Sequence, residues 1–489
     1  MHHPRSGSLR ALLGLSCLAL PAFPASAETL KEALARAYQS NPTLTAARAG
    51  QRATDENVPL AKAPGRPSAN VTGTYQEMLQ RPYYGYTSTP QRDFTGQASA
   101  SVPIYQGGAV RNRIASAKQG VLAGREDLRA TEASVFSQVV AAYMDVIRDT
   151  SVVSYNRQNV ASLELNLQAS RDRFEVGDLT RTDVAQSESR LALARASLQS
   201  AEAQLITSRE TYIALVGDVP GDLETPPPLP GLPASADAAV TVALKDNPSI
   251  LAAQHNRDAA HYTVRAARAA VSPRLSAVAN GSYVDYLGSE KDLAAPLSYG
   301  SIKQAAAGLQ LTVPIYQGGQ PGAQTRQNIA RESQAIETTI EVERNVISQT
   351  RAAYASWQAS LHAIQSTKLA VSAGELSLEG VKAENSVGTR TVLDILNSQR
   401  DLIDAQVQYV TAQRNAYVAG FSLLAAMGHA QAADLNLDTG GPLYDPTTNY
   451  ERVRGKLGDF SFAPTPAAQA TRTVDTPAQQ AGPETPPAR

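Results

Sequence analysis

Val102-Pro-Ile-Tyr-Gln-Gly-Gly108 recurs unchanged as Val313-Pro-Ile-Tyr-Gln-Gly-Gly319, 211 residues further along the chain. Val176-Gly177 recurs as Val387-Gly388 at the same displacement, and Asn41-Pro42 recurs as Asn247-Pro248 at a displacement of 206. A seven-residue identity with matched spacing is the signature of an internal repeat. We therefore expect two copies of one structural unit, at 28–217 and 236–428. A linker at 218–235 with six prolines separates them, because proline interrupts helices.

The composition excludes several classes of protein. The 489 residues carry 44 basic and 45 acidic side chains, so nothing favours a nucleic-acid partner. The single cysteine, Cys17, excludes disulfide frameworks and thiolate metal sites. The histidines after residue 28 show no i, i+4 metal-binding pair, and the chain has no Gly-x-Ser-x-Gly elbow and no phosphate-binding loop. We expect no enzyme activity, no cofactor and no metal site.

Residues 1–27 are typical of a secretory signal peptide. Two arginines precede an apolar run at 11–20, and Ala25-Ser26-Ala27 offers small residues for cleavage before Glu28. Acylation of Cys17 is the alternative, but Gly14 stands where a lipoprotein signal usually has leucine. At the other end, residues 463–489 are rich in proline and have no apolar period, so we expect a disordered tail that export does not need.

Each copy contains a pair of alternating strands, at 69–104 and 275–316. The clearest run is Phe94 to Ile104, where even-numbered positions are apolar or glycine and the odd-numbered positions 95–101 are polar. This period fits either lipid-facing strands with a wet lumen or a half-buried soluble antiparallel sheet. The long, tyrosine-rich loops at 77–92 and 284–301 favour the membrane. Four strands cannot close a membrane barrel, so a membrane location requires several chains.

Long proline-poor segments follow the strands. We expect long helices at 109–176 and 320–387 and return helices at 182–216 and 391–427, with a short helix at the start of each copy. A continuous helix of the longer kind would reach about 100 Å at 1.5 Å per residue, and it needs a partner surface along its length. A heptad on each return helix, large side chains alternating with small ones, indicates antiparallel coiled-coil packing.

These motifs together resemble the TolC family of outer-membrane export channels, over roughly residues 28–428. The resemblance implies a mainly α-helical fold with membrane β-strands. Each chain of a homotrimer would supply four strands to a twelve-stranded β-barrel and long coiled-coil helices to a tunnel, with 429–462 in a mixed α/β equatorial region. It implies passive exit of drugs or secreted proteins through the outer membrane of a Gram-negative bacterium, with a large periplasmic part. The partners implied are a periplasmic adaptor, an inner-membrane transporter and outer-membrane lipid. From the residues alone, a periplasmic coiled-coil scaffold is the alternative.

The resemblance also implies a gate at the periplasmic ends of the helices. The turns Val176-Gly177 and Val387-Gly388-Thr389 match adaptor-contacting turns, and Arg390 matches an arginine that ties to a Thr-Asp pair, here Thr182 and Asp183. Asp394 matches the first of two acidic residues that ring the constriction. Asn397 replaces the second, and Asn385 stands where a family member has tyrosine. Without the resemblance, Arg390 is an ordinary exposed charge after a helix-ending glycine.

Overall fold

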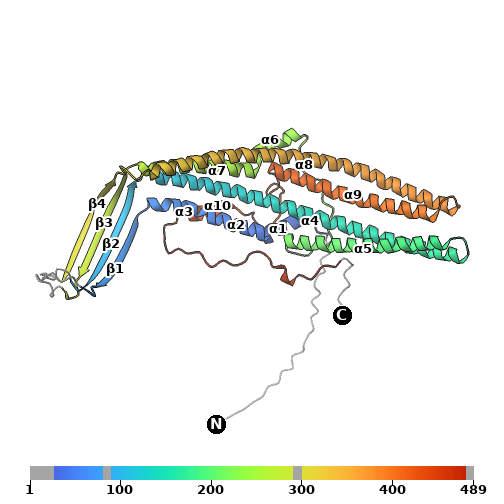
Figure 1. The fold of residues 1–489 in the computed structure, drawn as a ribbon, viewed down its shortest axis with the longest axis horizontal. Helices are drawn as coiled ribbons and strands as arrows, with labels where there is room; N and C mark the ends of the chain where they lie inside the picture. Colours follow the sequence, from blue (N-terminus) through green and yellow to red (C-terminus); the bar gives the residue numbers. More distant parts are fainter. Residues whose placement is uncertain (1–26, 81–89, 290–299, 481–489) are drawn as a thin grey trace, which may run out of the picture.

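The computed structural model of the chain describes residues 27–80, 90–289 and 300–480. Figure 1 shows an elongated molecule with a β-sheet at one end, long helices running to the other end, and short helices packed along the part of the long helices between the sheet and their middle. Most of the expected signal peptide, the tips of the two tyrosine-rich loops and residues 481–489 lie outside the described residues.

The two copies contain nearly the same succession of elements, except that the first has two helices, α2 and α3, where the second has the single helix α7. The first has α1 (Leu30–Ser40), α2 (Pro42–Asp55), α3 (Asn57–Lys62), β1 (Ser68–Glu77), β2 (Arg92–Tyr105), α4 (Ala109–Glu175) and α5 (Arg181–Val216). The second has α6 (Ala236–Asp246), α7 (Pro248–Arg268), β3 (Arg274–Asp285), β4 (Ser301–Thr312), α8 (Gln320–Ser386) and α9 (Val392–Met427), followed by α10 (Pro446–Val453). The ends of the four long helices lie within one residue of those expected.

The recurring Gln-Gly-Gly explains how each strand pair is joined to its long helix. Gly107 and Gly108 have φ values of 62° and 83°, and Gly318 and Gly319 have 61° and 80°. Two successive left-handed residues are accessible to glycine at little cost, whereas a side chain would strain them. The chain can therefore turn sharply from β2 into α4 and from β4 into α8.

The four strands form one antiparallel sheet in the order β1-β2-β3-β4. Its register gathers the apolar positions on one face, where Val71 lies opposite Ala98, Val102 opposite Ala277 and Leu275 opposite Leu311. The other face is polar, and the Ser99 hydroxyl donates a hydrogen bond of 2.5 Å to the Asn70 side chain. Val71 is 82% exposed and Leu309 71%, so the described residues of one chain leave both side chains on the apolar face uncovered.

The second strand pair is shorter than expected. β4 ends at Thr312, whereas the alternation had indicated a strand to residue 316. The reason is that Thr312 pairs with Arg274, the first residue of β3, so the chain beyond it has no strand to pair with. Pro314 also lacks a backbone N–H for a ladder. β2 does continue through Pro103, because Ser276 and Leu275 of β3 extend alongside it.

The main hydrophobic core lies at mid-length of the long helices, within a collar that we call the belt: α1, α2, α3, α6, α10 and residues 218–235. Phe136 and Tyr143 of α4, Tyr212 of α5 and Phe421 of α9 are at most 1% exposed there. The two longest helices, α4 and α8, differ in how much of their surface is buried. Eighteen residues of α4 are buried, whereas five residues of α8 are. Within the described residues, no helix is both long enough and apolar enough to cross a membrane.

The described part of the C-terminal tail, residues 463–480, has no α-helix or strand. Residues 463–480 run as extended chain with one short 3-10 turn at Thr473–Asp475. Arg209 of α5 donates a hydrogen bond of 2.6 Å to the Gln480 carbonyl, and the Gln479 N–H donates to Glu210 at 3.1 Å. These two contacts join the end of the described tail to α5.

Candidate functional site

The first helical hairpin ends in a glycine turn at the end of the molecule opposite the sheet (Figure 1). Gly177 has a φ of 88°, and the Asp178 N–H reaches back to the Arg173 carbonyl at 2.9 Å. This is the hydrogen-bond pattern with which left-handed glycines close helices. Val176, next to the glycine, is 75% exposed, so the tip presents an apolar side chain to its surroundings.

The second hairpin repeats this turn with additional polar contacts. Gly388 has a φ of 84°, Val387 is 74% exposed, and the Thr389 N–H donates to the Glu384 carbonyl at 3.0 Å. The Asn385 side chain donates to the Arg390 carbonyl at 2.7 Å. Asn385 therefore braces the turn through the backbone, which an amide can do and a phenol ring at this position could not do in the same way.

Arg390 is paired inside its own turn. Its Nε lies 2.8 Å from the Glu384 carboxylate, and both side chains are about half exposed. This contact raises the pKa of Arg390, mainly through the hydrogen bond to Glu384. Within one chain the structure does not bring Arg390 to Thr182 or Asp183. Thr182 is exposed and has no side-chain hydrogen bond among the described residues.

Asp183 and Asp394 hold the starts of the two return helices. Each is the third residue of its helix and exchanges hydrogen bonds with the threonine before the helix: Asp183 with Thr180, and Asp394 with Thr391 at 2.8–3.3 Å. Such capping boxes satisfy free N–H groups at a helix start. Hydrogen bonds from Thr180 and Thr391 lower the pKa of the two carboxyl groups. Both therefore carry negative charge at neutral pH.

Neutral amides on α9 connect the second hairpin to the first. The Arg190 guanidinium of α5 donates to the side-chain oxygen Oδ1 of Asn397 on α9 at 3.0 Å. Gln399, also on α9, donates to Asn159 of α4 at 3.1 Å. A small apolar cluster lies between them, formed by Leu163, Leu167, Leu191, Ala194 and Leu396. Asn397 thus binds a neighbouring helix in this chain.

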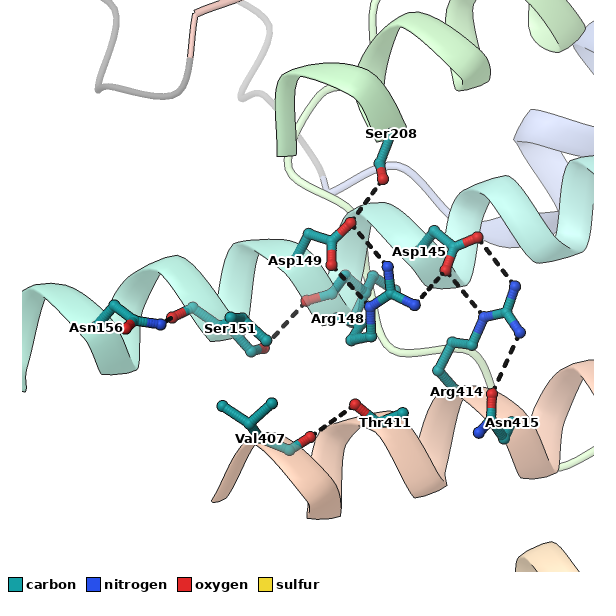
Figure 2. Close-up of polar contacts among 12 residues, drawn as sticks. Asp145, Arg148, Asp149, Ser151, Asn156, Ser208, Val407, Thr411, Arg414 and Asn415 are labelled. Carbon is teal, nitrogen blue, oxygen red and sulfur yellow. Dashed lines mark hydrogen bonds and ion pairs between the residues drawn. The ribbon is translucent and has the colours of Figure 1, made fainter. Parts of the chain in front are cut away.

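A charged network at the belt was missed by the sequence analysis. Figure 2 shows Asp145, Arg148 and Asp149 of α4 meeting Ser208 of α5 and Arg414 of α9. Arg414 binds Asp145 with two nitrogens at 2.9 and 3.0 Å, and Arg148 binds Asp149 at 2.7 and 2.9 Å. The Ser208 hydroxyl donates to Asp149 at 2.6 Å.

This network ties three helices together where they leave the belt. The side chain of Asp149 is 5% exposed, and those of Asp145, Arg148 and Arg414 are 21–24% exposed. The hydrogen bond to Asp149 raises the pKa of Arg148. In sequence, acidic and basic residues at such spacing on a long helix are indistinguishable from a solvated face. The repeat offered no clue either, since position 359, equivalent to 148, is alanine.

The geometry therefore combines an uncovered two-faced sheet, long paired helices and two matched hairpin tips. Among residues 27–80, 90–289 and 300–480, no group of three or more metal-ligating side chains is arranged to hold a metal ion. What the arrangement can do is present long helical walls and narrow, charged helix ends.

Comparison with known proteins agrees with this geometry. The sequence matches the family described as outer membrane efflux protein over residues 33–218 and 239–429. It is 34% identical over 446 residues to the outer membrane efflux protein BepC of Brucella suis, covering 90% of this chain and 94% of that protein. It is 26% identical over 468 residues to the outer membrane protein TolC of Escherichia coli, covering 91% of each.

A solved structure shows the same fold. The CmeC outer membrane channel of Campylobacter jejuni superposes with a TM-score of 0.73 at 16% identity, over 88% of this chain and 90% of that one. The resemblance to the TolC family and the tandem-duplicated, mainly α fold with antiparallel strands are thereby confirmed. The chain belongs to the family of outer membrane efflux proteins.

Proposed function

We propose that this chain is the outer-membrane channel of a tripartite export system. It would act as a homotrimer that gives passive exit to drugs or secreted proteins. An inner-membrane transporter supplies the energy and, through its own specificity, the cargo, and a periplasmic adaptor joins the two. The observation that carries the proposal is the sheet, whose apolar face and outer edges are left uncovered by the part of a single chain that the structure describes.

The uncovered edges support a trimer. β1 and β4 each have one neighbouring strand in the described chain. Unpaired backbone groups cannot face lipid, so these edges need partners. Pairing β4 of one chain with β1 of the next, three times around, closes twelve strands with the apolar face outward and the Asn70–Ser99 face toward the lumen.

The helices support the same assembly. α7 packs on both α4 and α8, whereas its counterparts in the first copy, α2 and α3, pack on α4 and leave Leu60 66% exposed. On α8, Ile329, Ile336 and Ile340 are 38–43% exposed and share one helix face. The duplication therefore predicts that α3 of one chain covers α8 of the next. This contact between chains would be the counterpart of the packing of α7 on α4 and α8 within one chain.

The gate is proposed at the hairpin ends. In the trimer, Arg390 would exchange its Glu384 partner for Thr182 and Asp183 of a neighbouring chain. Three copies of Asp394 would ring the axis and favour cations. The exposed valines of the tips, Val176 and Val387, are the apolar contacts offered to the adaptor.

Single-channel conductance tests this proposal. Purified protein in a planar bilayer should give small, cation-preferring openings, and Arg390→Ser should enlarge them. Arg171→Ser is the matched control, because Arg171 forms an equally exposed ion pair with Glu188 along the first hairpin. Conductance unchanged by Arg390→Ser would remove Arg390 from the gate. No conductance from a verified trimer would refute the channel itself.

A further inference from the structure

The first residue expected after signal-peptide cleavage occupies a built pocket in the belt. Ala27 is exposed, whereas Glu28 is 6% exposed. The pocket is formed by Arg36 of α1, Tyr143 of α4, Tyr212 of α5 and linker residues 218–224. The burial boundary therefore coincides with the expected cleavage site between Ala27 and Glu28.

Every polar group of Glu28 has a partner in this pocket. Its N–H donates to the Asp222 carbonyl at 2.7 Å, and its carbonyl accepts from Tyr143 at 2.8 Å and from the Glu224 N–H at 3.0 Å. Its carboxylate accepts from Tyr212 at 2.8 Å and from the Gly221 N–H at 3.3 Å, and it lies 3.3 Å from Arg36. A buried carboxylate is costly unless it is bonded in this way.

The tyrosines act as permanent donors. Tyr143 and Tyr212 are both fully buried, with ring centroids 6.5 Å apart. Burial, followed by the nearby Glu28 charge, raises the pKa of both hydroxyls. They stay protonated at any physiological pH and keep donating to Glu28.

The internal repeat shows that this pocket is particular to the chain start. By the two repeat displacements, Ala234 is the counterpart of Glu28 and Tyr354 that of Tyr143. Tyr354 donates to the Ala234 carbonyl at 3.0 Å, as Tyr143 does to Glu28. The counterpart of Tyr212, however, is Leu423, which is fully buried. In the second copy, where the chain continues through Ala234, a leucine lines this place. In the first copy, where processing would create a chain end at Glu28, the pocket is acidic and offers hydrogen bonds.

The charge around the pocket suits an ammonium group. Glu28, Asp218, Asp222 and Glu224 lie in or beside it, and Arg36 is the one cation that the described ion pairs place there. An α-amino group is mostly protonated at pH 7. Cleavage before Glu28 would add that positive charge at the Glu28 nitrogen, 2.7 Å from a carbonyl oxygen.

We propose that this pocket is a binding site for the chain's own processed amino terminus, formed when the leader is removed between Ala27 and Glu28. The seated terminus joins α1, the inter-repeat linker and both helices of the first hairpin. The belt then closes around an end that exists only in the mature chain.

Amine labelling of the purified trimer tests the proposal without reference to channel activity. Mass spectrometry should show a chain that starts at Glu28. An acylating reagent at neutral pH should label its α-amine at least about tenfold more slowly in the folded protein than in urea. Lys31, exposed three residues later, is the internal reference and should change little. Tyr212→Phe should raise the folded-state rate several-fold. Tyr354→Phe removes the hydroxyl that is the counterpart of Tyr143 in the second copy, and it should leave the rate unchanged.

Three outcomes would overturn the proposal. The first is a mature chain that starts at another residue, including an acylated Cys17. The second is an α-amine that is labelled as fast in the folded protein as in urea. The third is an equal change of the labelling rate in Tyr212→Phe and Tyr354→Phe. The last would mean that loss of any belt hydroxyl loosens the region. A failed conductance experiment would leave all three measurements interpretable, because they concern the belt alone.

Discussion

Arg414 of α9 binds Asp145 of α4 at the belt, and its replacement by methionine tests the network in Figure 2. Methionine keeps much of the arginine side chain's length and removes the guanidinium. The substitution deletes the two hydrogen bonds to Asp145 at 2.9 and 3.0 Å. It leaves Asp145 with one cation, Arg148, at 2.8 Å.

The expected cost follows from burial. The side chains of Arg414 and Asp145 are 22% and 24% exposed. Removing one partner of a buried pair costs about 3–5 kcal/mol when the other charge is left alone. Because Arg148 still compensates Asp145, we expect about 2 kcal/mol per chain, or roughly a 30-fold change in the unfolding equilibrium.

The assay uses the protein's single tryptophan, Trp357. It lies on α8 and lines the same cleft of about 460 Å³ as Arg148 and Arg414. Its fluorescence therefore reports on separation of the helices beside the network. We would follow unfolding in urea, at low salt and at about 1 M salt. A partly buried pair is screened little, so the loss should persist at high salt.

Arg400→Met is the matched control. It makes the same change on the same helix, but Arg400 is 60% exposed and its partners Asp401 and Asp404 are 66% and 64% exposed. After solvent screening, such pairs contribute at most about 0.5 kcal/mol. Equal destabilisation by the two substitutions, or a loss at Arg414 that vanishes in salt, would refute the reasoning.

Three further outcomes are expected. Asn397→Asp turns the 3.0 Å contact with Arg190 into an ion pair and adds a second acidic ring to the proposed trimer. Conductance should therefore fall and the preference for cations should rise. Unchanged selectivity in bilayer recordings would place Asn397 outside the pore. The pKa of Asp394 is lowered, so its capping hydrogen bonds are intact above the ordinary value of 3.8 and are lost as the pH falls through the lowered pKa. Hydrogen exchange of the backbone amides at the start of α9 should rise in that pH range. Asp394→Asn should abolish this pH dependence. Leu309→Arg, on the apolar face, should cost roughly 2–4 kcal/mol if that face meets lipid, and so deplete trimers from outer-membrane fractions. Gln310→Arg, on the opposite face, should leave assembly intact, and equal effects would argue against a lipid-facing sheet.

Local signals account for what could be predicted from the sequence. Helix ends at the long hairpins were predictable because Gly-Gly and Val-Gly turns act within a few residues. The strand faces were predictable because alternation at period two needs only the neighbouring residues. The end of β4 was not, since it depends on where β3 begins, some forty residues earlier in the chain.

The same difference between local signals and contacts of distant residues applies to the candidate site. The turns of the proposed gate could be located in the sequence, and the capping role of Asp394 follows from the threonine three residues before it. The partners of Arg390 and Asn397 could not be assigned in the same way. Arg390 had a carboxylate six residues away, Glu384, and Asn397 meets an arginine 207 residues away, Arg190.

By itself, the sequence determined that this protein is a duplicated pair of strand-and-hairpin units, because the repeated Gly-Gly and Val-Gly motifs build the same turns in both copies. Only the tertiary structure decided which charges meet. Glu28 and Tyr212 are 184 residues apart, and Asp145 and Arg414 are 269 apart. Such pairs form when packing brings helices side by side, and the burial that makes them strong exists only in the folded chain.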